Sequence, residues 1–204
     1  MVQHTVPIPE RLGAPRPDAD VFEWTEDELF RFCQVNRELL IERSAMGEVI
    51  VTLPAEGYSG HQSGEVFRQL AAWAVTDKTG VAFDSGTGFL LPNGAMRSPD
   101  AAWVRRSRLA VLSRRRKEHF IPLCPDFVIE VASPSEELSS LREKMEEYRN
   151  NGAALGWLVL PASTQVEVYA SSGVEVLASP QAITAAPALA GFQLDLTSVW
   201  TPPF

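Results

Sequence analysis

The sequence predicts a mixed α/β (α+β) fold in which helices flank a mixed β-sheet. Two apolar stretches of strand length, 126–132 and 155–160, lie on either side of a stretch with helical periodicity. Short runs that alternate apolar and polar residues, 165–170 and 173–177, are typical of strands with one solvated face. Helices early in the chain and many strands after them favour helices packed on a sheet.

The chain has 204 residues, which suits one domain with a substantial core. Residues 1–24 contain several prolines and no periodicity, so we expect an extended N-terminal arm. Residues 25–204 are expected to form a single domain. No apolar run approaches the length of a membrane span, and the first residues lack the pattern of a signal peptide. We therefore expect a cytoplasmic protein without a membrane partner.

Helices are predicted from capping signals and periodicity. Thr25 and Glu28 have the spacing of a capping box, which predicts a helix that ends near Asn36. A second helix is predicted at about 59–77, and the basic residues 107–118 are expected to form a short one.

Strands are predicted where apolar residues alternate or form short runs between turn residues. They lie at 38–43, 48–53, 80–84, 88–91, 100–105, 126–132, 155–160, 165–170, 173–177 and 192–196. Pro92-Asn93-Gly94 is a strong hairpin-turn signal.

The net charge of −8 argues against strong non-specific binding to nucleic acid. Basic residues are nevertheless concentrated in one segment, which holds eight of the chain's 18. They are Arg97, Arg105, Arg106, Arg108, Arg114, Arg115, Arg116 and Lys117. Two interpretations remain open, a solvated face and a patch that contacts phosphates beside a functional site.

The cysteine and histidine content excludes two common kinds of site. Cys33 and Cys124 are too few and too far apart for a disulfide framework or a zinc site, and we expect buried thiols. The three histidines are scattered, which argues against a histidine-based zinc hydrolase.

The main functional signal is a carboxylate in the middle of an apolar strand. In the strand 126–132, Glu130 shares a face with Asp126, Val128 and Ala132. A buried carboxylate is costly unless it has a partner or a cation. Asp126 is too distant to share a metal ion with Glu130, because four strand residues span about 13 Å.

A partner on a neighbouring strand would lie about 5 Å away, and Asp100 begins such a strand. Two carboxylates supplemented by water suit Mg²⁺ or Mn²⁺. Such an ion can polarise a phosphoryl oxygen and generate a hydroxide nucleophile. Asp100 could equally be an ordinary residue at the end of a strand.

A cation that assists an attacking water would complete this site. The helix after the strand carries an apolar stripe of Leu138, Leu141, Met145 and Tyr148, with Lys144 at its margin. If the helix folds back over the strand, Lys144 can reach Glu130. The alternative is an exposed lysine paired with Glu143 or Glu147.

Two long motifs resemble a known family. The runs FDSGTGFLLPNGAMRSPDAAWV and PLCPDFVIEVASPSEELSSLREKMEEYRNNGAALGWLVLP are similar to the Uma-type putative restriction endonuclease family of bacteria. That family is a branch of the PD-(D/E)XK nuclease superfamily. The resemblance covers about 25–204 and is most specific between Phe83 and Pro161.

The resemblance implies a restriction-endonuclease-like mixed β-sheet with helices on both sides. It implies that Asp100 and Glu130 match the metal-binding acidic residues. Ala132 stands where the superfamily has its lysine, and the resemblance suggests that Lys144 has taken over that role. Glu65 matches a helical acidic residue that can join the metal site.

Three functions follow as expectations, of which the third and weakest is a metal-dependent hydrolase of another substrate. The first is a metal-dependent nuclease that hydrolyses phosphodiester bonds with Mg²⁺ or Mn²⁺, DNA being the favoured substrate. The second is a catalytically silent nuclease-fold module that binds nucleic acid or a protein partner. Apolar residues in the C-terminal strands would also allow a homodimer.

Overall fold

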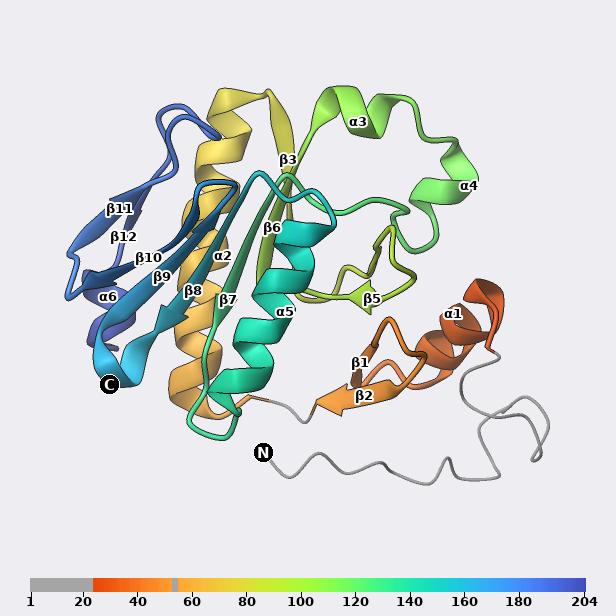
Figure 1. Ribbon diagram of the computed structural model, residues 1–204, viewed down its shortest axis with the longest axis horizontal. Coiled ribbons are helices and arrows are strands. Elements are labelled where there is room, and N and C mark those ends of the chain that lie inside the picture. The colour runs from red at the N-terminus through yellow and green to blue at the C-terminus, as the bar shows by residue number, and fades with distance from the viewer. Residues whose placement is uncertain (1–23, 53–54) are drawn as a thin grey trace.

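A computed structural model describes residues 24–52 and 55–204, and the expected N-terminal arm lies outside these residues except for Trp24. The molecule is built around a six-stranded mixed sheet with the strand order β10-β9-β8-β7-β6-β3. Figure 1 shows the helix α5 on one face of this sheet and α2 on the other. Helices on both faces of a mixed sheet confirm the predicted fold class.

The centre of the sheet is the parallel pair β7 (Phe127–Val131) and β8 (Leu155–Leu160). Every residue of both strands is buried, which explains their nearly continuous apolar character. Because parallel neighbours need a crossover connection, the chain between them forms α5 (Leu138–Asn150). This crossover brings α5 back over the strand that carries Glu130.

The alternation of side chains along β7 separates two apolar layers. Ile129 packs in one layer with Val66 and Leu70 of α2 (Gly57–Asp77). Val128 packs in the other with Met145 of α5. Glu130 has the same parity as Val128, so its side chain lies on the α5 face of the sheet.

A smaller four-stranded sheet with the order β2-β1-β5-β4 lies beside the large one, as Figure 1 shows. Its strands are β1 (Leu40–Arg43), β2 (Val49–Thr52), β4 (Phe89–Leu90) and β5 (Met96–Arg97). The predicted hairpin turn joins the last two, and Gly94 adopts a φ of 90° there, which favours glycine. Helix α1 (Glu26–Val35) packs against this sheet and begins with the predicted capping box of Thr25 and Glu28.

The remaining elements extend the large sheet and its surroundings. They are β3 (Gly80–Asp84), β6 (Ala101–Arg105), β9 (Gln165–Ala170), β10 (Gly173–Ala178), β11 (Ala182–Thr184), β12 (Gln193–Asp195), α3 (Arg106–Ala110), α4 (Arg114–Lys117), α6 (Thr197–Trp200) and a 3₁₀ turn at Pro161–Ser163. The basic segment forms two short helices where one was expected. Strands β5 and β11 were not predicted, because two or three residues are too few to show a period.

Within the described part of the chain, none of the helices combines the length and the apolar character that crossing a membrane requires. Both cysteines are free, as expected, and Cys124 is buried whereas Cys33 is only partly buried.

Candidate active site

Asp100 and Glu130 lie on adjacent antiparallel strands. Strand β6 pairs with β7 so that Ala101 faces Ile129, and continuing this register by one residue places Asp100 opposite Glu130. The backbone N–H of Val131 donates a hydrogen bond of 2.8 Å to Asp100 Oδ2. Directly opposed residues of antiparallel strands are about 5 Å apart. The two carboxylates are therefore neighbours on one face of the sheet.

Lys144 reaches Glu130 from α5. Its Nζ lies 2.8 Å from Glu130 Oε1 and 2.9 Å from Glu42 Oε1. The hydroxyl of Tyr148, one helical turn further on, donates a 2.9 Å hydrogen bond to the same Glu130 Oε1. Lys144 is thus not an exposed lysine paired with its helical neighbours, since its side chain is only 15% exposed.

Each of the two carboxylates keeps one oxygen available. Lys144 and Tyr148 both contact Oε1 of Glu130, and the bond from Val131 uses Oδ2 of Asp100. In the described residues, no hydrogen bond reaches Glu130 Oε2 or Asp100 Oδ1. These two oxygens come from opposed positions on neighbouring strands, an arrangement that suits two monodentate ligands of one cation.

The electrostatics of the cluster favour an added positive charge. Burial raises the pKa of Glu130 to about 8, and the negative charges of Asp100 and Glu42 contribute to this rise. Burial likewise raises the pKa of Asp100 to about 6. Although burial alone would lower it, the carboxylates of Glu130 and Glu42 raise the pKa of Lys144 above its ordinary value. Lys144 and Arg97 both contact the cluster, and the pKa values of Glu130 and Asp100 stay raised beside them.

The residues present fit a hydrated Mg²⁺ or Mn²⁺. Hard oxygen donors are the ligands that these ions prefer, and Mg²⁺ commonly binds through one or two carboxylates with water in its other positions. The described residues contain no group of three or more His, Cys, Asp or Glu side chains that could hold a metal ion. The fit therefore rests on Asp100 and Glu130 alone, with water expected to complete the coordination.

Glu42 is a member of this cluster that the sequence patterns did not predict. It lies on β1, is 9% exposed, and accepts a 2.6 Å hydrogen bond from the backbone N–H of Ser98. Its other oxygen lies 3.5 Å from Nη1 of Arg97. A signal was present in the sequence, because Glu42 is a carboxylate inside a predicted apolar strand, as Glu130 is.

Arg97 turns inward and connects the small sheet to α5. Its Nε lies 2.5 Å from Glu147 Oε2, and Asn93 Nδ2 donates a 2.9 Å hydrogen bond to the other oxygen of Glu147. Arg97 is only 9% exposed, so it belongs to this buried network and not to an exposed basic patch.

The structure does not bring Glu65 to this cluster. Glu65 lies on α2, which covers the opposite face of the sheet from α5. Its carboxylate accepts hydrogen bonds from Arg68 at 2.6 Å and 2.7 Å, from Gln69 at 3.0 Å and from Ser198 at 3.4 Å. The bonds from Arg68 hold the pKa of Glu65 below its ordinary value, so the carboxylate already has its counter-charge.

The predicted nucleic-acid-binding residues begin at the far end of β6. Arg105 ends this strand and Asp100 precedes it, a separation of about 17 Å along an extended strand. Asp126 contacts Arg105 and Arg108 there, at 3.5 Å and 3.1 Å. This placement also confirms that Asp126 is no partner of Glu130.

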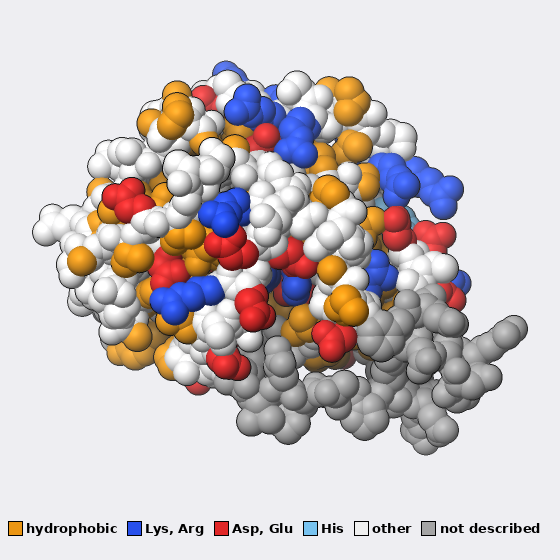
Figure 2. Space-filling model, viewed as in Figure 1, with side chains coloured by type: hydrophobic (Ala, Val, Ile, Leu, Met, Phe, Trp, Pro, Cys, Tyr) orange, Lys and Arg blue, Asp and Glu red, His pale blue; other side chains and the backbone are white. Residues whose placement is uncertain are grey.

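Several residues of the basic segment already have partners. Arg106 Nε donates to the carbonyl of Lys78 at 2.7 Å, and Arg114 and Arg116 form ion pairs with Glu118 and Glu26 at 2.7 Å and 2.9 Å. Arg115 and Lys117 are exposed, and neither has an ion-pair partner among the residues described. Figure 2 shows the Lys and Arg side chains gathered over α3 and α4, whereas Asp and Glu predominate around α5.

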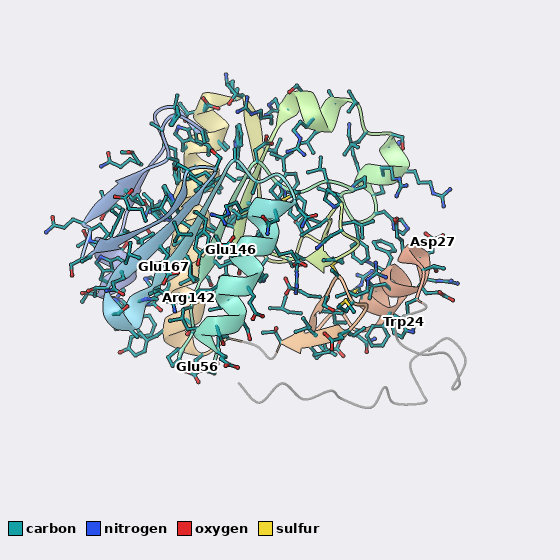
Figure 3. All side chains as sticks on the ribbon, viewed as in Figure 1. Trp24, Asp27, Glu56, Arg142, Glu146 and Glu167 are labelled. Carbon is teal, nitrogen blue, oxygen red and sulfur yellow. The ribbon has the colours of Figure 1, made fainter. Side chains whose placement is uncertain are left out.

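A second ion-pair cluster lies on the other side of α5, where that helix faces β9. Arg142 and Glu167 point toward one another in Figure 3, and Arg142 Nη2 lies 2.5 Å from Glu167 Oε1. Tyr169 donates a 2.8 Å hydrogen bond to Glu167. These groups line an open groove of about 950 Å³, and their charges compensate one another.

The fold defines a class of protein. A mixed sheet with helices on both faces is the restriction-endonuclease-like fold. The chain belongs to the Uma2 family, described as putative restriction endonucleases, whose sequence profile matches residues 26–197.

A solved structure supports the same fold. The chain is similar to a putative nuclease belonging to DUF820 from Anabaena variabilis ATCC 29413, with a TM-score of 0.66 and 19% sequence identity. The similarity covers 78% of this chain and 89% of the other. No curated protein matches the chain. At this level of identity, the solved structure bears on the fold alone.

Proposed function

We propose that this protein is a metal-dependent nuclease that hydrolyses phosphodiester bonds in nucleic acid, with DNA as the favoured substrate. Asp100 and Glu130 would hold Mg²⁺ or Mn²⁺ through Oδ1 and Oε2. The observation that carries the proposal is a pair of carboxylate oxygens on neighbouring strands to which no described residue donates a hydrogen bond, with the Lys144 ammonium 2.8 Å from one carboxylate. Family membership supports the same reaction class.

The chain's own residues have separate tasks in this proposal. A bound divalent cation polarises a phosphoryl oxygen and lowers the pKa of its water. Lys144 holds a positive charge beside the cluster, where it can orient the attacking water and stabilise the charge that develops on the phosphate. Tyr148 donates a hydrogen bond to Oε1 of Glu130, which would leave Oε2 to bind the cation. Arg115 and Lys117 on α4 would contact backbone phosphates away from the reacting bond.

Hydrolysis of labelled DNA and RNA in Mg²⁺ or Mn²⁺ tests the proposal. Asp100→Asn should abolish cleavage, because it removes an anionic ligand at almost constant volume. Glu65→Gln is the matched control and should retain activity, since Glu65 lies on the other face of the sheet. Wild type and Asp100→Asn with equal activity would refute the catalytic role of Asp100.

A second candidate function is a nuclease-fold module that binds without turnover. It is favoured by Ala132 in the position of the superfamily lysine, and by the full engagement of Lys144 with two carboxylates. This candidate predicts nucleic-acid or protein binding that is unchanged in Asp100→Asn and no hydrolysis by wild type. The cleavage assay therefore separates the two candidates.

A further inference from the structure

Glu42 connects the small sheet to both halves of the candidate active site. Its Oε1 lies 2.9 Å from Lys144 Nζ and accepts the 2.6 Å hydrogen bond from Ser98 N–H. Ser98 lies two residues before Asp100. One carboxylate therefore contacts the helix that carries Lys144 and the backbone that leads to Asp100.

The contacts of Glu42 differ from those of a metal ligand. Oε1 has two partners, and Oε2 faces Arg97 at 3.5 Å. Both oxygens of Glu42 are thus engaged, whereas Glu130 and Asp100 each keep one. This difference indicates that Glu42 holds Lys144, the Ser98 backbone and Arg97, and does not bind the cation.

The ammonium of Lys144 depends on this support. Glu130 Oε1 is shared between Lys144 and Tyr148. Among the described residues, Glu42 is the only other carboxylate within 4 Å of Lys144 Nζ. A lysine ammonium on a flexible four-carbon stem needs more than one fixed acceptor to keep one position. Glu42 supplies the second acceptor from a different sheet.

We propose that Glu42 is a positioning residue: it holds the Lys144 ammonium beside Glu130 and fixes the backbone before Asp100, which makes the small sheet part of the active site. The expected effect of Glu42 on kcat rests on the nuclease function proposed above. Its structural consequence, the position of the ammonium, is independent of activity.

Because the chain has only three lysines, the exchange of the Lys144 ammonium with water can be measured directly. Its lysines are Lys78, Lys117 and Lys144, and the first two are exposed. In protein labelled with ¹⁵N-lysine, wild type should show one ammonium signal protected from exchange with water, which Lys144→Met identifies by removing it. Glu42→Gln should abolish the protection of that signal, because the neutral amide forms no ion pair with Nζ. Glu48→Gln, an exposed glutamate of the same hairpin, should leave the signal unchanged.

The kinetic arm uses the same variants. Glu42→Gln should lower kcat by about 10²-fold with little change in KM, the loss expected when a catalytic group is misplaced by 1 Å. Glu48→Gln should retain wild-type kcat. The isosteric amide keeps an acceptor for Ser98 N–H, so the fold should persist. If Glu42→Gln does not fold, Glu42→Asp decides, because its shorter carboxylate should also abolish the protected signal.

The outcomes separate the two proposals. Inactive wild-type protein with a protected Lys144 signal that Glu42→Gln abolishes would refute the nuclease function and support the positioning role. A protected signal that persists in Glu42→Gln, or an active Glu42→Gln with wild-type kcat, would overturn the positioning role and leave the nuclease function standing.

Discussion

At the scale of single residues, the candidate site is defined by how each carboxylate uses its two oxygens. Glu130 gives Oε1 to Lys144 and Tyr148, Asp100 gives Oδ2 to a backbone N–H, and Glu42 uses both oxygens. Identical functional groups in one cluster therefore acquire different roles. The difference follows from hydrogen bonding, because a carboxylate oxygen already engaged by strong donors is less available to a cation.

The raised pKa of Glu130 predicts a pH-dependent stability. The folded protein binds the proton of Glu130 up to a pH of about 8, whereas an ordinary glutamate releases it near 4.5. Between these values the unfolded chain binds fewer protons, so the free energy of unfolding should fall as pH rises, by a few kcal/mol for a full shift. Asp100, whose pKa is raised to about 6, contributes in the same direction at the lower end of the range.

Urea denaturation from pH 5 to 8.5 in EDTA would measure this slope. Glu130→Gln should flatten the profile, because the amide does not titrate. Glu65→Gln should preserve it, because the pKa of Glu65 is lowered and that group does not titrate in this range. A wild-type profile without a decline, or one that Glu130→Gln leaves unchanged, would contradict the assignment.

We expect the hydrogen bond from Tyr148 to affect both the free energy of unfolding and the binding of metal. Tyr148→Phe removes the hydrogen bond to Glu130 and should cost roughly 1–3 kcal/mol of unfolding free energy. It should also weaken Mn²⁺ binding, because Glu130 then lacks the donor that orients its free oxygen. Calorimetric titration with Mn²⁺ measures the second effect.

Tyr169→Phe is the matched control for this prediction. Tyr169 is also buried and also donates to a glutamate, Glu167, but it lies outside the site. Its replacement should reduce stability and leave Mn²⁺ binding intact. Equal Mn²⁺ affinities in the two variants would show that Tyr148 has no role in metal binding.

At the scale of elements, helix α5 determines whether the site can form. It carries Lys144, Glu147 and Tyr148. Glu147 and Tyr148 follow Lys144 by three and four residues, so the three side chains lie on one face of the helix, toward β7 and the small sheet. The helix reaches the sheet closely because Gly156 on β8 has no side chain. A Cβ built there would lie 2.6 Å from Met145 Cε and 3.3 Å from Val128 Cγ2.

Gly156→Ala should therefore force the Met145 side chain of α5 to move. We expect a loss of roughly 1–3 kcal/mol, because Met145 is fully buried and has little room to move. Cleavage activity should fall with it, since Met145 is next to Lys144. Thermal unfolding and the cleavage assay measure the two effects.

Gly64→Ala is the control for the glycine substitution itself. Gly64 lies within α2, and a Cβ there would meet no atom within 4 Å. It should stabilise the protein by up to about 1 kcal/mol through helix propensity. Gly156→Ala with unchanged stability and activity would show that α5 tolerates a larger separation from β8.

At the scale of the whole molecule, charge is distributed unevenly. The net charge is −8, yet basic side chains are concentrated on α3, which follows the end of β6 remote from Asp100, and on α4, which forms an ion pair with α1. Acidic residues surround α5. A nucleic acid bound by this protein would therefore be attracted to α4 and repelled by the surface of α5.

This distribution predicts a salt-dependent role for the exposed residues of α4. Replacing Arg115 and Lys117 by Gln should reduce the slope of log Kobs against log salt by about 1 for each phosphate that is no longer neutralised. The rate of cleavage at saturating nucleic acid should change little, because neither residue is among those that contact the carboxylates. Binding titrations at several salt concentrations measure the slope.

Arg68→Gln is the control, because Arg68 lies on α2 and is paired with Glu65. It should leave the slope unchanged. If the α4 double variant also left it unchanged, the basic segment would be a solvated face, the other interpretation that its sequence allows.

Local patterns in the sequence were sufficient to predict most of the secondary structure and the three residues proposed for the candidate site. Periodicity of two or of 3.6 residues is a local property, so the buried strand of Glu130, the helix of Lys144 and the capping box at Thr25 were all predictable. The cost of burying Glu130 required a cationic partner, and the length of a strand excluded Asp126 and directed attention to Asp100.

Which distant residues meet could be learned from the folded structure alone. Lys144 and Glu42 are separated by about a hundred residues, and no local pattern indicates that β1 approaches α5. The position of Glu65 depends on which face of the sheet α2 covers, and that is set by how the two apolar layers pack. Sequence periodicity specifies what each element can bury, whereas contacts between distant elements specify which polar groups share one site.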